Sequence, residues 1–268
     1  MADSLDTGSF VVASWNVNFR RDVAHQVDAL LASSPDVVVL QEVRAAGFAE
    51  FAERLRNHGL PHFATSASSV SGRQMGRYVA VASRFAFDMA APVDSPAPET
   101  SVCLDVHAPG GSFDLVGVYV PSIARRDGLK VPTQLAMNAR MAGASARPHL
   151  ICGDFNSPKA ESAAGVTLFS KPVRSEEYAG EHALMGGLED LGLRDAFRAC
   201  NGWEVAEPSW FWKNRGRSGG YRLDHIWVSP HFELMRCWYD HSVRELGLSD
   251  HSAMFAEVAL RHSARATG

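Results

Sequence analysis

Asp154 and Asn156 stand two positions apart at the end of an apolar, strand-like segment with the sequence HLICGDFN. Alternate side chains of an extended chain point to the same side, so we expect the carboxylate and the carboxamide to face one ligand together. Aspartate and asparagine also close turns on nearby backbone N–H groups where a strand ends. These two residues therefore leave a catalytic and a purely structural interpretation open.

Polar residues also mark the ends of the other predicted strands. They are Asn16 in SWNVN, Glu42 in VVLQE, Tyr119 in GVYVPS, Asp224 in RLDH, and Asp250 with His251 in LSDH. Each has an ordinary structural explanation, such as a helix cap, a surface charge, a half-buried ring, a salt bridge between Asp224 and Arg222, or a turn. Their recurrence from strand to strand favours one shared polar site.

The oxygen atoms of these residues suit a small, hard divalent cation. Ligands of the kind that Mg²⁺ or Mn²⁺ prefers are offered by Glu42 and Asp250 with an amide carbonyl of Asn16 or Asn156. If Asp224 accepts from one imidazole nitrogen of His251, the other nitrogen is left for substrate or water. No Cys/His group with zinc spacing competes. A metal beside an Asp–His pair predicts hydrolysis of phosphoesters.

Hydrophobic periodicity predicts the elements that carry these residues. Strands are expected at 10–15, 36–42, 77–84, 101–108, 113–122, 149–155, 221–229, 235–242 and 253–260, and helices at 21–34, 48–59 and 133–145. Residues 159–189 are the least readable segment. The mixed succession indicates an α/β protein, and ten to twelve strands are many for one sheet, so two mixed, mainly antiparallel sheets packed face to face with helices outside are expected.

The composition is that of an ordinary globular protein, with 268 residues, 46% of them hydrophobic, and a net charge of −4. This balance gives no overall basic surface for nucleic acid, although a local patch remains open. Four separated cysteines are expected to be reduced. Without a predicted signal peptide or membrane span, a cytoplasmic location is expected. The sequence leaves the oligomeric state open, with a monomer favoured. We expect one domain over 1–268 with flexible tails at about 1–9 and 262–268.

Taken in order, the motifs SWNVN, VVLQE, GVYVPS, GDFNSP, RLDH and SDH resemble those of the endonuclease/exonuclease/phosphatase superfamily. This superfamily includes exonuclease III-like apurinic endonucleases, DNase I-like nucleases, sphingomyelinases and inositol-polyphosphate 5-phosphatases, and the resemblance covers Ser14 to His251. It implies a four-layer α/β sandwich of two sheets.

The resemblance also implies a role for each site residue. Asn16, Glu42 and Asp250 would surround Mg²⁺, and Tyr119 would contact the scissile phosphate. Asn156 and His251 would stabilise the charge that develops on the phosphate. Asp154 would orient or deprotonate the attacking water, and Asp224 would hold His251.

The segment PSWFWKNRGRSGGYRLDH, residues 208–225, is the best indicator of substrate. Aromatic faces for bases and cations for backbone phosphates are predicted at Trp210, Trp212, Arg215 and Arg222. The segment is similar to the substrate loop of exonuclease III-like enzymes, although its aromatic residues also suit the core of an edge strand. Arg73, Arg77 and residues 123–130 offer further phosphate contacts or solvated charge.

Three functions follow as hypotheses. The first is a Mg²⁺- or Mn²⁺-dependent DNA endonuclease or exonuclease of exonuclease III type, acting on abasic, nicked or 3′-end DNA. The second is a metal-dependent phosphatase or phosphodiesterase for a small-molecule or lipid-headgroup phosphoester. The third is a catalytically silent binding module. Arg44, where apurinic endonucleases often carry lysine, and the negative net charge argue against a standard abasic-site enzyme.

Overall fold

The computed structural model describes residues 8–69, 76–122, 128–144, 146–158, 160–161, 167–168 and 175–261. The predicted tails lie almost wholly outside these ranges, as do Arg73 and residues 123–127. No helix within the described ranges combines the length and apolarity needed to cross a membrane. The cysteines Cys103, Cys152, Cys200 and Cys237 are all free.

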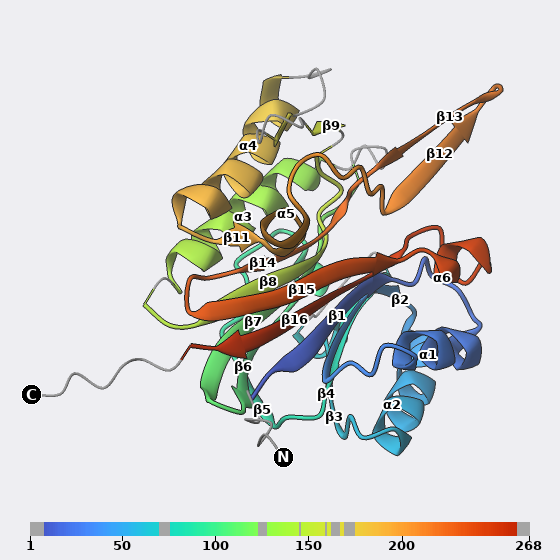
Figure 1. Ribbon diagram of the computed structural model, residues 1–268, viewed down its shortest axis with the longest axis vertical. Coiled ribbons are helices and arrows are strands. Elements are labelled where there is room, and N and C mark those ends of the chain that lie inside the picture. The colour runs from blue at the N-terminus through green and yellow to red at the C-terminus, as the bar shows by residue number, and fades with distance from the viewer. Residues whose placement is uncertain are drawn as a thin grey trace, which may run out of the picture.

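Two six-stranded sheets form the centre of the molecule (Figure 1). The first has the order β15-β16-β1-β2-β4-β3, with β1 (Phe10–Asn16), β2 (Val37–Val43), β3 (His62–Thr65), β4 (Tyr78–Ser83), β15 (Phe232–Asp240) and β16 (Ala253–Leu260). The second has the order β11-β14-β8-β7-β6-β5, with β5 (Phe87–Met89), β6 (Ser101–Ala108), β7 (Gly111–Tyr119), β8 (His149–Asp154), β11 (Arg194–Asp195) and β14 (Asp224–Val228). Only β1·β2 and β7·β8 are parallel pairs within these described sheets.

Helices cover the outer face of each sheet. α1 (Val23–Leu31) and α2 (Phe48–Asn57) pack on the first sheet, and α3 (Lys130–Ala142) and α4 (Ser175–Asp190) pack on the second. The buried helix residues include Val27, Leu30, Phe51 and Leu55 on one side, and Met137, Met141, Leu184 and Leu188 on the other. The four layers confirm the predicted α/β sandwich. The shorter elements are α5 (Ala196–Asn201), α6 (Ser242–Glu245), β9 (Ala160–Glu161), β10 (Thr167–Leu168) and the 3₁₀ turns Ala45–Gly47, Ser66–Ser69 and Pro98–Thr100.

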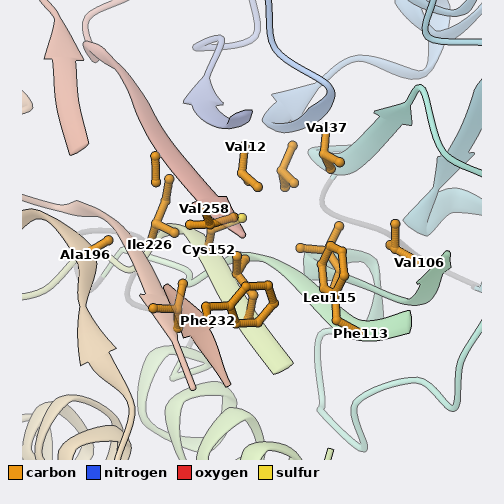
Figure 2. Close-up of a cluster of buried hydrophobic side chains, with 14 of the residues drawn as sticks. Val12, Val37, Val106, Phe113, Leu115, Cys152, Ala196, Ile226, Phe232 and Val258 are labelled. Atoms are coloured by element: carbon orange, nitrogen blue, oxygen red, sulfur yellow. The ribbon is translucent and has the colours of Figure 1, made fainter. Parts of the chain in front are cut away.

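The main core lies between the two sheets (Figure 2). Val12, Leu115, Cys152, Ile226 and Val258 come from five different strands and are all buried in it. Because side chains alternate along a strand, each strand contributes every second residue to this layer and the others to a helix layer. Full burial of an aliphatic side chain stabilises the fold by about 1.5–3 kcal/mol, so this layer fixes the register of the strands that enter it.

A two-stranded hairpin, β12 (Trp210–Asn214) with β13 (Arg217–Tyr221), projects from the sandwich in Figure 1. Its two-residue turn, Arg215 and Gly216, has positive φ angles of 46° and 79°. Positive φ at both central residues is the backbone that suits a tight hairpin turn. At Gly219, a Cβ atom would stand 2.8 Å from the ring of Trp212, so the ring lies directly across the glycine.

Candidate active site

The polar residues at the strand ends continue the inter-sheet face of their strands. In β1, Ala13 and Trp15 face the helix layer while Val12 faces the second sheet, so the alternation turns Asn16 inward. By the same alternation, Asp154 follows Cys152 in β8 and Asp224 precedes Ile226 in β14. The register pairs Asp224 directly with Asp154. The inter-sheet layer is therefore apolar along its length and polar at one end.

Asp154 lies at the centre of this polar end and is almost fully buried. Its Oδ2 accepts hydrogen bonds from Asn16 Nδ2 at 2.9 Å and from Asn156 Nδ2 at 3.1 Å, and its Oδ1 accepts from the backbone N–H of Asn156 at 2.8 Å. Gly153 allows the close approach of β8 to β7, because a Cβ atom there would stand 1.9 Å from the carbonyl oxygen of Val118. Burial raises the pKa of Asp154 to about 7, with His251 opposing the shift and Asp224 adding to it.

His251 and Asp224 form the predicted pair. Nδ1 of His251 lies 2.8 Å from Asp224 Oδ2, and its Nε2 lies 3.9 Å from Asp154 Oδ2. Burial by itself would lower the pKa of His251, but the charges of Asp224 and Asp154 outweigh it and raise the pKa to about 10. The indole N–H of Trp15 donates to the backbone carbonyl of His251 at 3.0 Å and helps to hold the loop. The imidazole thus lies between two buried aspartates, an arrangement that favours its charged form.

Asn156 departs from the sequence prediction. Its φ of 47° takes the chain out of the extended conformation, so the alternation argument for Asp154 and Asn156 is wrong. The carboxylate of Asp154 closes a turn by accepting from the backbone N–H of Asn156, and Nδ2 of Asn156 also donates to the carbonyl oxygen of Val120 at 2.8 Å. The structural interpretation applies, and the same turn also carries the carboxamide to the carboxylate.

The Asn156 loop rests on a buried ion pair that sequence reasoning missed. Nζ of Lys130 donates to the carbonyl oxygen of Asn156 at 3.0 Å and to Glu181 Oε1 at 2.8 Å. Both charged side chains are at most 2% exposed. Ser157 Oγ donates to the same Glu181 oxygen at 3.0 Å, and His225 Nε2 lies 2.8 Å from the carbonyl oxygen of Ser157. These partners lie far apart in sequence, and no motif links them.

Glu42 reaches the site through a β-bulge. Simple alternation after Val39 would turn Gln41 inward and Glu42 toward the helices. The register between β2 and β4 shifts between Leu40 and Val43, and Glu42 has a φ of 55°. A bulge of this kind redirects a side chain. Oε1 of Glu42 accepts a hydrogen bond from Arg77 at 2.9 Å.

Tyr119 closes this side of the site at the end of β7. Its Oη lies 3.2 Å from Nη1 of Arg77, the same nitrogen that donates to Glu42. Burial, followed by the charges of Glu42 and Asp154, raises the pKa of Tyr119 well above its ordinary value. The phenol is therefore neutral and keeps its proton for hydrogen bonding.

The expected metal ligands are spread around this centre. Asn16 contacts Asp154, Glu42 pairs with Arg77, and Asp250 Oδ2 accepts from Trp210 Nε1 at 3.0 Å. Among the described residues, the compact group of ligand atoms, all within 4.8 Å of one another, is Asp154, Asp224 and His251. Glu42 and Asp250 do not belong to that group.

The donor chemistry of the site nevertheless fits a divalent cation. Buried carboxylates concentrate negative charge, and Oδ1 of Asp224 is a buried oxygen without a hydrogen-bond partner among the described residues. Mg²⁺ and Mn²⁺ prefer hard, anionic oxygen ligands of this kind.

The four predicted substrate residues have different positions. Trp210 and Trp212 are partly exposed on β12, and Arg215 is exposed at the tip of the hairpin. Arg222 is a correction, because its side chain is only 2% exposed and its guanidinium binds Asp195 at 2.6 and 3.2 Å. The sequence motif placed Arg222 correctly near Asp224, but Arg222 lies in the short segment between β13 and β14, where its guanidinium binds Asp195 in the interior.

Replacing Arg222 with methionine is expected to destabilise the fold by about 3–5 kcal/mol, the cost of leaving one charge of a buried pair unpaired. Burial opposes ionisation of Asp195, yet Arg222 and His225 hold its pKa well below its ordinary value. Urea unfolding measures the effect, with Arg215→Met at the exposed turn as the matched control. If Arg222→Met left the free energy of unfolding unchanged and weakened substrate binding alone, the original assignment would stand.

Buried carboxylates around an imidazole, at one end of a two-sheet α/β sandwich, form a site that can activate water for hydrolysis. The model of the Endonuclease/Exonuclease/phosphatase family matches residues 13–251, so the chain belongs to this family and is a phosphoester hydrolase. This confirms the resemblance drawn from the motifs. No curated protein sequence matches the chain significantly.

Solved structures share the fold at low sequence identity. A 3′ phosphatase, NExo, from Neisseria, bound to product DNA hairpin, is 23% identical with a TM-score of 0.63, and the match covers 93% of this chain and 99% of that one. An AP endonuclease from Archaeoglobus fulgidus is 20% identical, with a TM-score of 0.65 and coverage of 92% and 98%. An endonuclease/exonuclease/phosphatase from Beutenbergia cavernae is 19% identical, with a TM-score of 0.66 and coverage of 94% and 72%.

Proposed function

We propose that the chain is a Mg²⁺- or Mn²⁺-dependent phosphodiester hydrolase of exonuclease III type that acts on abasic, nicked or 3′-end DNA. The observation that carries this proposal is the attachment of the hairpin to the site. Trp210 donates to Asp250, and its backbone forms a bridge with His251. A strand that carries aromatic faces for bases thus begins beside the Asp–His pair.

Asp154 takes the proton of the attacking water. It is a buried carboxylate, and Asn16 and Asn156 hold both of its oxygens in fixed directions. A base whose pKa is near the working pH transfers protons efficiently. Its raised pKa therefore suits this role.

His251, Asn156 and Tyr119 stabilise the charge that develops on the phosphate. Asp224 holds the imidazole from behind, so the Nε2–H of His251 points into the site. The carboxamide of Asn156 and the neutral phenol of Tyr119 supply further polar groups at the same end of the sheets. The imidazole donor is held in place by Asp224 before the reaction, so it needs no reorganisation during it.

Glu42, Asp250 and Asn16 are the residues proposed to hold the cation. A bound Mg²⁺ or Mn²⁺ would neutralise phosphate charge and help the leaving oxygen depart. The buried, unpartnered oxygen of Asp224 supports a further polar or cationic neighbour in the site.

The likeness to a 3′ phosphatase bound to a DNA product and to an AP endonuclease supports DNA as the substrate. The partly exposed Trp210 and Trp212 and the exposed Arg215 of the hairpin support it independently. We further propose a cytoplasmic location, which agrees with four free cysteines, and a monomeric state.

A panel assay tests this function. Purified protein with Mg²⁺ or Mn²⁺ is mixed with abasic duplex, 3′-recessed duplex, single-stranded DNA, RNA, and phosphorylated small molecules. Cleavage of abasic or 3′-end duplex is expected, with complete loss in EDTA and a steep loss with salt, because phosphate contacts release counterions. Turnover of small phosphoesters with DNA left intact would instead identify a phosphatase of small substrates.

A further inference from the structure

Two guanidinium groups lie against one aromatic ring beside the proposed active site. The Cζ atoms of Arg44 and Arg77 lie 4.7 and 5.8 Å from the ring centroid of Phe19. At these distances the cations are attracted to the ring face. Phe19 therefore holds two positive charges close together.

The ring itself is held by the proposed active site. Phe19 and Asn18 have positive φ angles of 55° and 50°, conformations that a phenylalanine adopts only under constraint. The backbone N–H of Asn18 donates to Asn16 Oδ1 at 2.8 Å, and that of Phe19 donates to the carbonyl oxygen of Glu42 at 3.1 Å. The loop after β1 is thus positioned by the same residues that line the site.

Arg77 connects this ring to the site. Its Nη1 contacts both Glu42 Oε1 and Tyr119 Oη, yet its side chain is 35% exposed. A guanidinium has five donors, so two contacts leave donors for a ligand. Arg77 therefore spans the proposed phosphate-contacting phenol and the solvent.

Positive charge exceeds negative charge around Phe19. Arg44 is half-buried, and its guanidinium makes no hydrogen bond or ion pair with any residue that the structure describes. The negative charge of Glu42 neutralises the charge of Arg77 but not that of Arg44. The next residues in the loop, Arg20 and Arg21, are exposed arginines. In a chain of net charge −4, such a local excess favours an anionic ligand at this place.

We infer that Arg44 and Arg77, seated on Phe19, form a phosphate-binding subsite beside Glu42 and Tyr119 that takes a phosphate monoester. This inference rests on the proposed function and specifies the phosphate that the site prefers. A monoester carries about −1.5 to −2 charge at pH 7, whereas a diester carries one negative charge. Two guanidinium groups, which bind phosphate through paired donors, favour the more highly charged group.

Variants of the two arginines test the subsite on matched substrates. One DNA duplex carries a 3′-terminal phosphate, and a second of the same sequence carries an internal abasic analogue cleaved at a diester. For Arg77→Met, we expect kcat/KM to fall about 10-fold or more further on the terminal phosphate than on the diester, the scale of a lost charged hydrogen bond. Arg44→Met should act in the same direction, and Arg77→Lys should restore part of the preference.

An exposed arginine on an outer helix provides the control. Arg54 pairs with Glu50 on α2, so Arg54→Met should change neither rate. p-Nitrophenyl phosphate is a second monoester probe. If Arg77→Met loses kcat/KM on both monoesters, the subsite accepts monoesters in general. If it loses kcat/KM only on the DNA end, the subsite is specific for a terminal DNA phosphate. Equal losses on the diester and both monoesters would show that Arg77 has a structural role and would overturn the inference.

A binding measurement separates this inference from the proposed function. Inorganic phosphate should raise the thermal melting temperature of the wild-type protein, and Arg77→Met should require about 10-fold or more phosphate for the same shift. If wild type cleaves no DNA but shows this arginine-dependent phosphate binding, the proposed DNA activity fails and the subsite stands. If phosphate stabilises wild type and Arg77→Met equally, the subsite fails whatever the activity.

Discussion

Replacing Asp154 with asparagine is expected to lower turnover at least ~100-fold, the scale of a lost general base. The substitution keeps the size of the side chain but removes the oxygen that accepts the proton. Asp154 accepts from Asn16 Nδ2 and Asn156 Nδ2 on one oxygen and from the backbone N–H of Asn156 on the other. A carboxamide has one accepting oxygen, so it can accept from only one side. On the other side its own NH₂ group would face an N–H donor.

Unfolding must therefore be measured beside activity. We expect Asp154→Asn to lose about 1–3 kcal/mol of stability from the unsatisfied donor, while the protein stays folded at 25 °C. Steady-state kcat on the substrate identified by the panel assay, corrected for the folded fraction, gives the catalytic effect. A variant that keeps nearly full kcat would show that the water is activated elsewhere.

The sequence predicts this centre well because strand alternation is a local property. Once the apolar residues of β1 and β8 are assigned to the inter-sheet layer, Asn16 and Asp154 must lie on the same layer. The contact of 2.9 Å between them follows from placing the two strand ends at one end of the sandwich. The two sheets and three of the helices were predicted for the same reason, since their patterns are strong and periodic.

The failures come from residues whose position depends on distant partners. α4 was not predicted, because its apolar residues contact α3 only in the folded protein and its sequence contains glycines and charges. Arg222 was assigned to substrate because its motif is basic and aromatic, but Asp195, 27 positions away, binds it in the interior. No local pattern reports such a pairing.

Backbone strain accounts for the remaining departures. Among the described non-glycine residues with positive φ, Asn18, Phe19, Glu42 and Asn156 all belong to the site or to the loop against it. Each such conformation costs on the order of 1–3 kcal/mol and persists only where surrounding contacts hold it. Propensity predicts the relaxed backbone, so it fails at the positions where Glu42 and Asn156 are turned toward the site.

His251→Ala and Asp224→Ala are each expected to lower kcat at least ~100-fold. The kcat of the double variant should be little lower than that of the less active single variant. The reason is that the two side chains act as one unit. Asp224 Oδ2 binds Nδ1 of His251 at 2.8 Å and holds its charged form, so removing the carboxylate also removes the orientation and the charge of the imidazole.

A double-mutant cycle on kcat measures this coupling. Independent residues would lose activity multiplicatively, by about 10⁴-fold in the double variant if each single loss is about 100-fold. Folding is checked by thermal unfolding, because Asp224→Ala removes the closest carboxylate of the buried His251 and leaves Asp154 and Asp250, at 3.9 and 4.0 Å from Nε2. Multiplicative losses in folded variants would show that Asp224 contributes to catalysis separately from His251, as a metal or water ligand through its unpartnered Oδ1. Strong coupling would assign Asp224 to the positioning of His251.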